Sequence, residues 1–185
     1  MRAEGALLVT HWGVSGPAIL RLSSYAARYL AENDYQAQLC INWLNAQGEQ
    51  EALSQLHGFQ CESSRRQVGN EYPRQFSAKL WQHLLTRAHI DLQKRWNELS
   101  LRDLNRVCSV LTSDVYQIES KGQYKEEFVT CGGIDLACIN ISTLEARQHP
   151  GLYFAGELLD VDGITGGFNL QAAWSMAAVV AKNFG

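Results

Sequence analysis

The chain has 185 residues, of which 46% are hydrophobic, so it can bury the core of one ordinary domain or two small ones and is not a disordered protein. Its formal charge of -3, from 16 basic and 19 acidic residues, gives no electrostatic reason to expect nucleic acid or an anionic membrane as a partner. No apolar run approaches the roughly 20 residues of a membrane span, and the N-terminus lacks the apolar core of a secretory signal. Five cysteines without a C-x-x-C pair argue against disulfides or zinc and predict a cytoplasmic protein.

The first quarter of the chain predicts a strand, a loop, a helix and a second strand. Residues 5–10 are short and apolar, as in a strand, and a loop follows over residues 11–17. Proline is tolerated in the first turn of a helix, and apolar residues spaced by three and four run on from Pro17 to about Glu32, so we expect a helix there. Alternating apolar and polar residues then predict a strand over residues 36–44.

The middle of the chain predicts two helices. Residues 47–70 are polar and punctuated by glycine, with little alternation. Residues 79–89 predict a helix, and a second helix begins after Ser100 and runs to about Leu111. Ser100 followed by Asp103 resembles an N-cap with an acidic third position.

The last third predicts strands and one helix. Residues 112–119 and 126–131 have the composition of two strands, joined by a turn at residues 121–122. Residues 151–156 predict a short apolar strand closed by glycine, and a loop rich in Asp and Gly follows over residues 157–167. Residues 168–183 predict a helix that is apolar nearly all round and is therefore expected to be buried. A strand, a glycine-rich turn and a buried helix make half of a doubly wound α/β unit.

The loop between that strand and that helix has the chemistry of a ligand site. Gly156 has no Cβ, so a ligand could approach its backbone closely. Glu157 follows at the carboxyl end of the strand, where ligands of open α/β sheets bind, and its carboxylate can accept hydrogen bonds from a polyol or ribose. Gly166 and Gly167 precede the helix, whose free N–H groups attract negative charge. A buried strand, turn and core helix without a ligand explain the same pattern, which by itself does not decide between the two.

Three segments of the sequence resemble motifs of one family. Residues 150–172 resemble the C-terminal FAD-binding segment of the bacterial NAD(P)/FAD-dependent oxidoreductases of the BaiN-type or aminoacetone oxidase family, P-G-L-Y-F-A-G-E-x-L-D-V-D-G-x-T-G-G-[YF]-N-L-Q-x-A. Residues 10–17 resemble the T-H-x-G-x-S-G-P loop of that family, and residues 129–134 resemble its V-T-x-G-G-V segment. All three occur in the family's order, and the resemblance is poorest between residues 45 and 75.

The resemblance implies a mixed fold, α+β with an α/β part. Residues 1–125 would form part of an inserted domain that is β-barrel-like, with a small helical subdomain at about 74–111. Residues 126–185 would form the C-terminal strand–turn–helix of a Rossmann-like FAD-binding domain. The family's G-x-G-x-x-G turn for the FAD pyrophosphate is absent from this sequence. We therefore expect a truncated or split protein that lacks its N-terminal FAD-binding half and, alone, holds FAD weakly or not at all.

The resemblance also implies the residues that contact FAD. Glu157 and Asp160 would contact the ribityl and pyrophosphate region, and residues 166–170 would line the pyrimidine edge of the flavin. A helix N-terminus there would stabilise the negative charge of reduced flavin at its N1–C2=O edge. Phe168 and Leu170 could instead be core residues, and Asp162 a turn former. The implied cofactor-binding set is Gly156, Glu157, Asp160, Gly163, Gly166, Gly167, Phe168, Asn169 and Leu170.

Catalytic residues are not identified by the sequence. His11 is a candidate acid or base because histidine titrates near neutral pH, but a loop histidine that hydrogen-bonds the backbone is the preferred interpretation. The other histidines, His57, His83, His89 and His149, have no metal-ligand spacing and are expected at the surface, so no metal site is predicted. Cys131 could be a redox thiol, although a small buried residue explains it better.

These observations predict a fragment of an FAD-dependent oxidoreductase that passes hydride through flavin N5 and that is inactive by itself. NAD(P)H would be the electron donor and a small molecule the substrate. The alternative is a cofactor-free binding or assembly module derived from a truncated flavoprotein. A third interpretation is a small-molecule binder that uses the same pocket without redox chemistry. Unpaired strand edges in a truncated Rossmann half would favour a homodimer.

Overall fold

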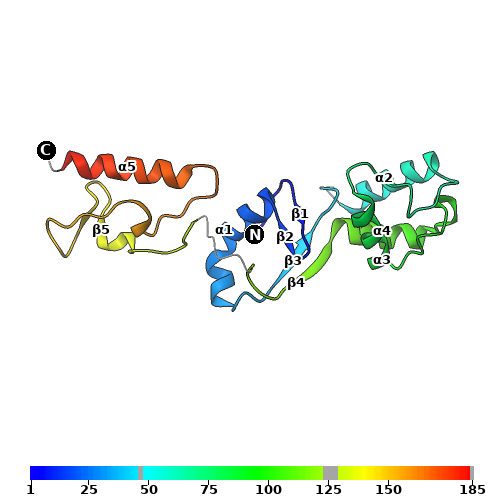
Figure 1. Cartoon of the computed structure of the whole chain (residues 1–185), viewed down its shortest axis with the longest axis horizontal. Helices are drawn as coiled ribbons and strands as arrows, with labels where there is room; N and C mark the ends of the chain where they lie inside the picture. The colour runs from blue at the N-terminus through cyan, green and yellow to red at the C-terminus, as the bar shows by residue number, and fades with distance from the viewer. Residues whose placement is uncertain (46–47, 123–128, 184–185) are drawn as a thin grey trace. The chain divides into compact units, whose positions relative to one another are not determined.

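The computed structural model describes residues 1–45, 48–122 and 129–183, which divide into two compact units. The first unit consists of Met1–Ala37 and Glu119–Gly185, and the second of Gln38–Ile118 (Figure 1). The described elements are mixed α and β, with five α-helices and three sheets of two strands each. Within the described ranges, no helix is both long enough and apolar enough to cross a membrane.

The first unit opens with a small hairpin and a helix. Strand β1 (Leu8–Val9) pairs antiparallel with β2 (Val14–Ser15), and α1 spans Pro17–Glu32. The predicted helix is confirmed, whereas the strand over residues 5–10 is shorter than predicted and part of the predicted loop is β2. Gly16 permits this hairpin-to-helix turn, because its φ is 100° and a Cβ there would lie 3.0 Å from the carbonyl oxygen of Ala6.

The second unit contains three helices and a two-stranded ladder. Strand β3 (Ala37–Ile41) pairs with β4 (Asp114–Ile118), and both strands were predicted. The helices are α2 (Glu49–Glu62), α3 (Ala78–Arg87) and α4 (Leu101–Thr112), and α3 and α4 lie where the periodicity places them. Helix α2 lies in the polar stretch where no element was expected. Its apolar periodicity is weak, because Ala52 and Leu56 are its only buried residues.

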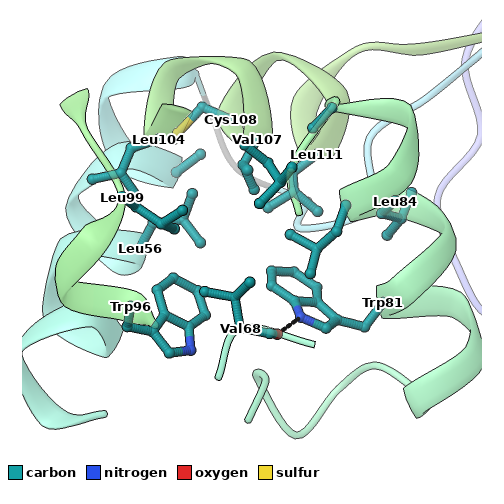
Figure 2. Packing of buried hydrophobic residues seen from close by; sticks show 14 of the residues in the cluster. Leu56, Val68, Trp81, Leu84, Trp96, Leu99, Leu104, Val107, Cys108 and Leu111 are labelled. Carbon is teal, nitrogen blue, oxygen red and sulfur yellow. Dashed lines mark hydrogen bonds between the residues drawn. The ribbon is translucent and has the colours of Figure 1, made fainter. Parts of the chain in front are cut away.

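Two tryptophans tie the loops of the second unit to its helices (Figure 2). Trp81 and Trp96 are fully buried, and their ring centroids lie 6.1 Å apart. Trp81 Nε1 donates to the carbonyl of Val68 at 2.7 Å, and Trp96 Nε1 donates to the carbonyl of Glu71 at 2.9 Å. Each indole therefore supplies apolar area to the core and a hydrogen bond to the loop between α2 and α3.

The N-terminus of α4 has the predicted capping box. Ser100 Oγ accepts a hydrogen bond from the N–H of Asp103 at 3.2 Å, and Asp103 Oδ2 accepts one from the N–H of Ser100 at 3.1 Å. Asp103 also pairs with Arg106 and, at 3.5 Å, with Lys94. The Ser100 N–H, with the two cations, lowers the pKa of the Asp103 carboxyl to about 2.

The C-terminal part of the first unit is built mostly from turns. Strands β5 (Ile139–Asn140) and β6 (Glu145–Ala146) form a hairpin beneath α5 (Phe168–Lys182) in Figure 1. Two short 3-10 helices complete it, η2 (Leu136–Cys138) and η3 (Gly156–Leu158).

Two strands predicted in this part are not present. In the stretch predicted as a strand over residues 151–156, only Tyr153 makes a bridge, to Glu145. Of the strand predicted over 126–131, residues 126–128 lie outside the described residues, and residues 129–131 form no strand. Hydrogen bonds within turns pair many of the backbone N–H and carbonyl groups here. The predicted strand–turn–helix of a doubly wound sheet is therefore not formed within the described residues.

Helix α5 forms where predicted, but the prediction that it is buried is wrong. None of its residues is buried, and Phe168, Leu170 and Trp174 are 59%, 70% and 77% exposed. Its other face packs through Met176, Val179 and Val180 against a small cluster centred on Ile139, Leu144 and Leu159. That cluster is too small to cover both sides of a helix that is apolar all round.

Prediction for the core. Leu111 is fully buried and Leu101 is 60% exposed on the same helix α4, so they form a matched pair. We expect Leu111→Ala to lower the free energy of unfolding of the second unit by about 2–5 kcal/mol through the cavity it leaves. Leu101→Ala should change it by less than about 0.5 kcal/mol. Urea unfolding followed by tryptophan fluorescence measures both, and equal effects would contradict the burial of Leu111.

Prediction for pH. Because folding depresses the pKa of Asp103, its carboxylate stabilises the fold above about pH 4, and this is lost as the pH falls towards about 2. We expect Asp103→Asn to reduce the free energy of unfolding by about 1–2 kcal/mol at pH 7, and to make little difference near pH 2. Urea titrations between these pH values test this. A deficit that stays constant with pH would show that the charge of Asp103 is not the stabilising feature.

Candidate cofactor site

Two of the three sequence motifs meet at Gly133. The N–H of Ile134 donates to the carbonyl of Leu158 at 2.8 Å, and the N–H of Asp160 donates to the carbonyl of Ile134 at 3.0 Å. This makes a single parallel bridge between Ile134 and Leu159. A Cβ on Gly133 would lie 2.6 Å from the carbonyl carbon of Leu159, so only glycine permits this approach. The segment 129–134 thus supports the loop that was predicted to hold the cofactor.

Asn169 holds the glycine loop from the first turn of α5. Its Oδ1 accepts a hydrogen bond from the N–H of Gly163 at 2.7 Å, and its Nδ2 donates to the carbonyl of Gly163 at 3.0 Å. Both polar atoms of the side chain therefore bind the loop backbone. A contact of Asn169 with a cofactor stays a prediction, and its main-chain N–H is the group that remains available for it.

The N-terminus of α5 is open. Gly167 is its N-cap, with φ 87° and no capping side chain, and the first turn contains no acidic residue. The first hydrogen bond of the helix runs from the N–H of Gln171 to the carbonyl of Gly167 at 3.0 Å. Within the described residues, the N–H groups of Phe168, Asn169 and Leu170 have no acceptor. Three free donors at the positive end of a helix dipole attract an anionic group.

Two carboxylates border this loop and differ in their surroundings. Glu157 is exposed, and its side chain has no hydrogen-bond or ion-pair partner in the described part of the chain. Asp160 is half-buried, and its Oδ1 accepts a hydrogen bond from Arg28 Nη2 at 2.5 Å. The Arg28 guanidinium lowers the pKa of Asp160. Glu157 is thus free to bind a ligand, whereas one oxygen of Asp160 is already occupied.

Arg28 is a site residue that the sequence did not indicate. It lies on α1, downstream of the loop over residues 10–17, and belongs to no motif. Only its contact with Asp160 reveals it, so no local signal could have identified it from the sequence.

Cys131 lies beside Asp162 in the same region. Partial burial, and then a hydrogen bond with the Asp162 carboxylate, raise the pKa of the Cys131 thiol. The thiol is therefore protonated near neutral pH, which argues against a redox role. It is half-buried, so the interpretation as a small buried residue is met only in part.

The exposure of several other residues decides between interpretations that the sequence left open. Phe168 and Leu170 are exposed, so their interpretation as core residues is wrong. His11 is exposed, and the backbone hydrogen bond expected for it is absent from the described residues; Thr10 holds that loop instead, through the carbonyl of Gly13. The other four histidines are exposed as predicted: His57, His83, His89 and His149.

A metal site and a surface depression are the other features that bear on binding. Among the described residues, no group of three His, Cys, Asp or Glu side chains is placed to hold a metal. A depression of about 280 Å³ lies on the β5–β6 hairpin, and it shares no residue with the predicted cofactor contacts. It is lined by Asn140, Glu145, Ala146, Arg147 and Pro150.

Comparison with known proteins identifies the family. Residues 1–129 match the family model described as the HI0933-like protein barrel and H2TH domain. The chain belongs to the HI0933-like family of flavoprotein oxidoreductases. The family predicted from the three motifs is therefore confirmed, and the match to a barrel and a helical domain agrees with the mixed α+β fold.

Three relatives align with nearly the whole chain. Ribosomal RNA dihydrouridine synthase of Escherichia coli K12 is 34% identical, over 96% of this chain and 42% of the relative. The protein of the same name from Haemophilus influenzae is 29% identical, over 95% and 41%. A 3-dehydro-bile acid delta(4,6)-reductase of Clostridium scindens is 31% identical, over 96% and 43%. The chain spans less than half the length of these relatives.

Prediction for the loop contact. Gly132 and Gly133 both have positive φ, but a Cβ on Gly132 would meet nothing within 4 Å. Both alanine variants carry backbone strain, and only Gly133→Ala adds the clash with Leu159. We expect Gly133→Ala to lose about 1–3 kcal/mol more stability than Gly132→Ala, and to speed amide hydrogen exchange at Ile134 and Asp160. Equal exchange in the two variants would contradict the close approach.

Proposed function

We propose that this chain is the C-terminal portion of an FAD-dependent reductase and supplies the flavin-ring side of the FAD site. In this proposal, residues 126–185 belong to the Rossmann-like FAD-binding domain, and residues 1–125 to the insert, with its helical part at about 74–111. The observation that carries the proposal is the open N-terminus of α5, where three N–H groups follow a turn of two glycines. When bound, FAD would supply hydride transfer at its N5, with NAD(P)H as the electron donor.

The residues of the loop fit the polar part of FAD. Glu157 has an unpaired, exposed carboxylate that can accept hydrogen bonds from ribityl or ribose hydroxyl groups. Asp160 would contribute its second oxygen, directly or through water, while Arg28 fixes its first. Gly156 has φ 74°, and a Cβ there would meet only the Cβ of Ala173, at 3.8 Å, so the backbone on the side away from α5 can lie against a ligand. Gly163, held by Asn169, sets the course of the loop between these groups.

The first turn of α5 fits the flavin ring. Its free N–H groups and the positive end of the helix dipole would hold the N1–C2=O edge and favour the negative charge that this edge carries in reduced flavin. Phe168 and Leu170 are exposed beside these donors and would pack against the edge of the ring. Gly166 and Gly167 leave room for it, because a Cβ on Gly167 would meet nothing within 4 Å and one on Gly166 only the Phe168 ring.

The exposed face of α5 supports the proposal that another part of an FAD-binding domain packs against this helix. Leu170 and Trp174 are at least 70% exposed, and large exposed apolar patches mark interaction surfaces. We propose that the other half of the FAD-binding domain, which would carry the pyrophosphate-binding G-x-G-x-x-G turn, covers this face. The chain alone would then bind FAD weakly and be inactive. Dimerisation through strand edges remains a prediction for size-exclusion chromatography.

The relatives' names suggest the reaction class. Making dihydrouridine and reducing the delta(4,6) bonds of a 3-dehydro-bile acid both add two hydrogens to a carbon–carbon double bond near a carbonyl group. We propose the same class here, with hydride from the flavin and a proton from an acid such as His11. The two names differ in substrate, an RNA base or a small molecule, and the charge balance of the whole chain was the only sequence argument against RNA.

A cofactor-free binding or assembly module is the second candidate function. The observation that favours it is the same apolar face of α5, which could bind another protein instead of the FAD-binding half. The visible spectrum discriminates between the two. A yellow preparation of the chain joined to its missing half supports the reductase, and an assembly module would show no flavin absorbance with or without added FAD.

Prediction for FAD binding. We expect Glu157→Gln, in the chain joined to its missing half, to raise the Kd for FAD roughly 10- to 100-fold, because it removes a hydrogen bond to a charged group. Glu119→Gln is the control, since Glu119 is also exposed and lies outside the loop. Flavin fluorescence quenching measures both. The role assigned to Glu157 fails if the two variants bind FAD equally well.

A further inference from the structure

The charge of this chain is strongly segregated along its sequence. Residues 63–106 contain nine of the 16 Lys and Arg residues and four of the 19 Asp and Glu residues, a formal charge of +5. The remainder of the chain has a formal charge of -8. The overall value of -3 therefore hides a basic segment, which lies within the second unit.

Backbone pairing brings part of this basic segment together. The loop after α2 runs antiparallel to the loop before α4: the N–H of Val68 donates to the carbonyl of Lys94, and the N–H of Trp96 donates to the carbonyl of Arg66, at 2.8 and 3.0 Å. Gln67 and Arg95 form a bridge between them. Residues 65–66 and 94–95, separated by a whole helix in the sequence, are thus neighbours.

The first turns of α4 add two more cations. Arg102 and Arg106 are four residues apart and lie on one face of the helix. Arg106 pairs with Asp103, which also binds Lys94 at 3.5 Å and so joins the loop to the helix. We call the resulting set the basic edge. It consists of Arg65, Arg66, Lys94, Arg95, Arg102 and Arg106.

The basic edge is available to a partner. Arg65, Arg66, Arg95 and Arg102 are exposed, and none of their side chains has an ion-pair partner within the described residues. The backbone that presents them is rigid, because Val68, Trp96 and Leu104 beneath it are fully or almost fully buried. Because this backbone is already formed, binding of a polyanion would have to order only the arginine side chains.

We propose that the basic edge binds the phosphate backbone of an RNA substrate. This rests on the proposed reductase function and assigns its substrate class. Five of the six cations are arginines, whose planar guanidinium groups match phosphate oxygens in pairs. The acidic remainder of the chain repels RNA and would direct it to this edge.

The relatives favour RNA over other polyanions. The two proteins named for ribosomal RNA align over 96% and 95% of this chain, so their alignments extend through the helical unit. An anionic membrane or an acidic protein would also bind arginines, but Leu101 is the one large hydrophobic side chain exposed within residues 63–106, and a single side chain is far less than the apolar face that membrane binding uses.

The test uses the whole chain and a fluorescein-labelled ribosomal RNA hairpin, with binding followed by fluorescence anisotropy at several salt concentrations. The variant carries Arg66→Gln, Arg95→Gln and Arg102→Gln, three exposed positions without ion pairs in the described structure. We expect its affinity to fall at least roughly tenfold at low salt, and the slope of log K against log salt to become shallower by about 2 to 3. Far-UV circular dichroism and the melting temperature should match those of the parent chain.

The control removes three exposed cations of the first unit, with Arg2→Gln, Arg21→Gln and Lys182→Gln. It should bind the hairpin within about twofold of the parent chain, since these residues lie outside the basic edge. Equal losses in variant and control, no binding by the parent chain, or binding to anionic vesicles in place of RNA would each overturn the proposal.

The outcome separates this inference from the proposed function. Suppose that the chain joined to its missing half is yellow and reduces an enone bile acid, but that the chain does not bind RNA. The RNA assignment would then be overturned, and the proposed reductase function would stand. Binding of RNA that depends on the basic edge, in a protein that never takes up flavin, supports the edge and rejects the reductase.

Discussion

The close approach of Gly133 to the backbone at Leu159 is the contact on which the candidate site depends. It leaves no space for a side chain and joins the loop before β5 to the loop before α5 by two hydrogen bonds. Asn169 fixes the same loop from the helix side. Without these contacts, Glu157, Asp160 and the open N-terminus of α5 would share a sequence segment but not a defined geometry.

The second unit depends on a different kind of contact. Its two buried tryptophans fill the core and at the same time bind the carbonyl groups of a long loop. That combination explains how a chain with little regular structure between α2 and α3 presents its arginines on a fixed backbone. Buried indole N–H groups need an acceptor, and the loop carbonyls provide it. Core packing and surface charge are therefore coupled in this unit.

Local signals predicted the elements whose stability is local. Helix α4 has a strong apolar periodicity and a Ser100–Asp103 capping box, and both its position and its cap agree with the structure. Helix α2 was missed because it offers the core only Ala52 and Leu56 as fully buried residues. The prediction of a strand over residues 151–156 was wrong for another reason. An apolar stretch becomes a strand only if it pairs with a partner strand, and in this stretch only Tyr153 forms a bridge, to Glu145.

By itself, the sequence determined the family, the position of α1, α3, α4 and α5, and the glycine-rich loop with its carboxylates. These depend on residues that lie close together in the chain, so periodicity and motif spacing reveal them. The tertiary structure decided which groups meet: Gly133 with Leu159, Arg28 with Asp160, and the arginines of two separate loops at one edge. It also decided that the outer face of α5 stays exposed. Such pairings join residues far apart in the sequence, and the backbone path that brings them together leaves no local pattern.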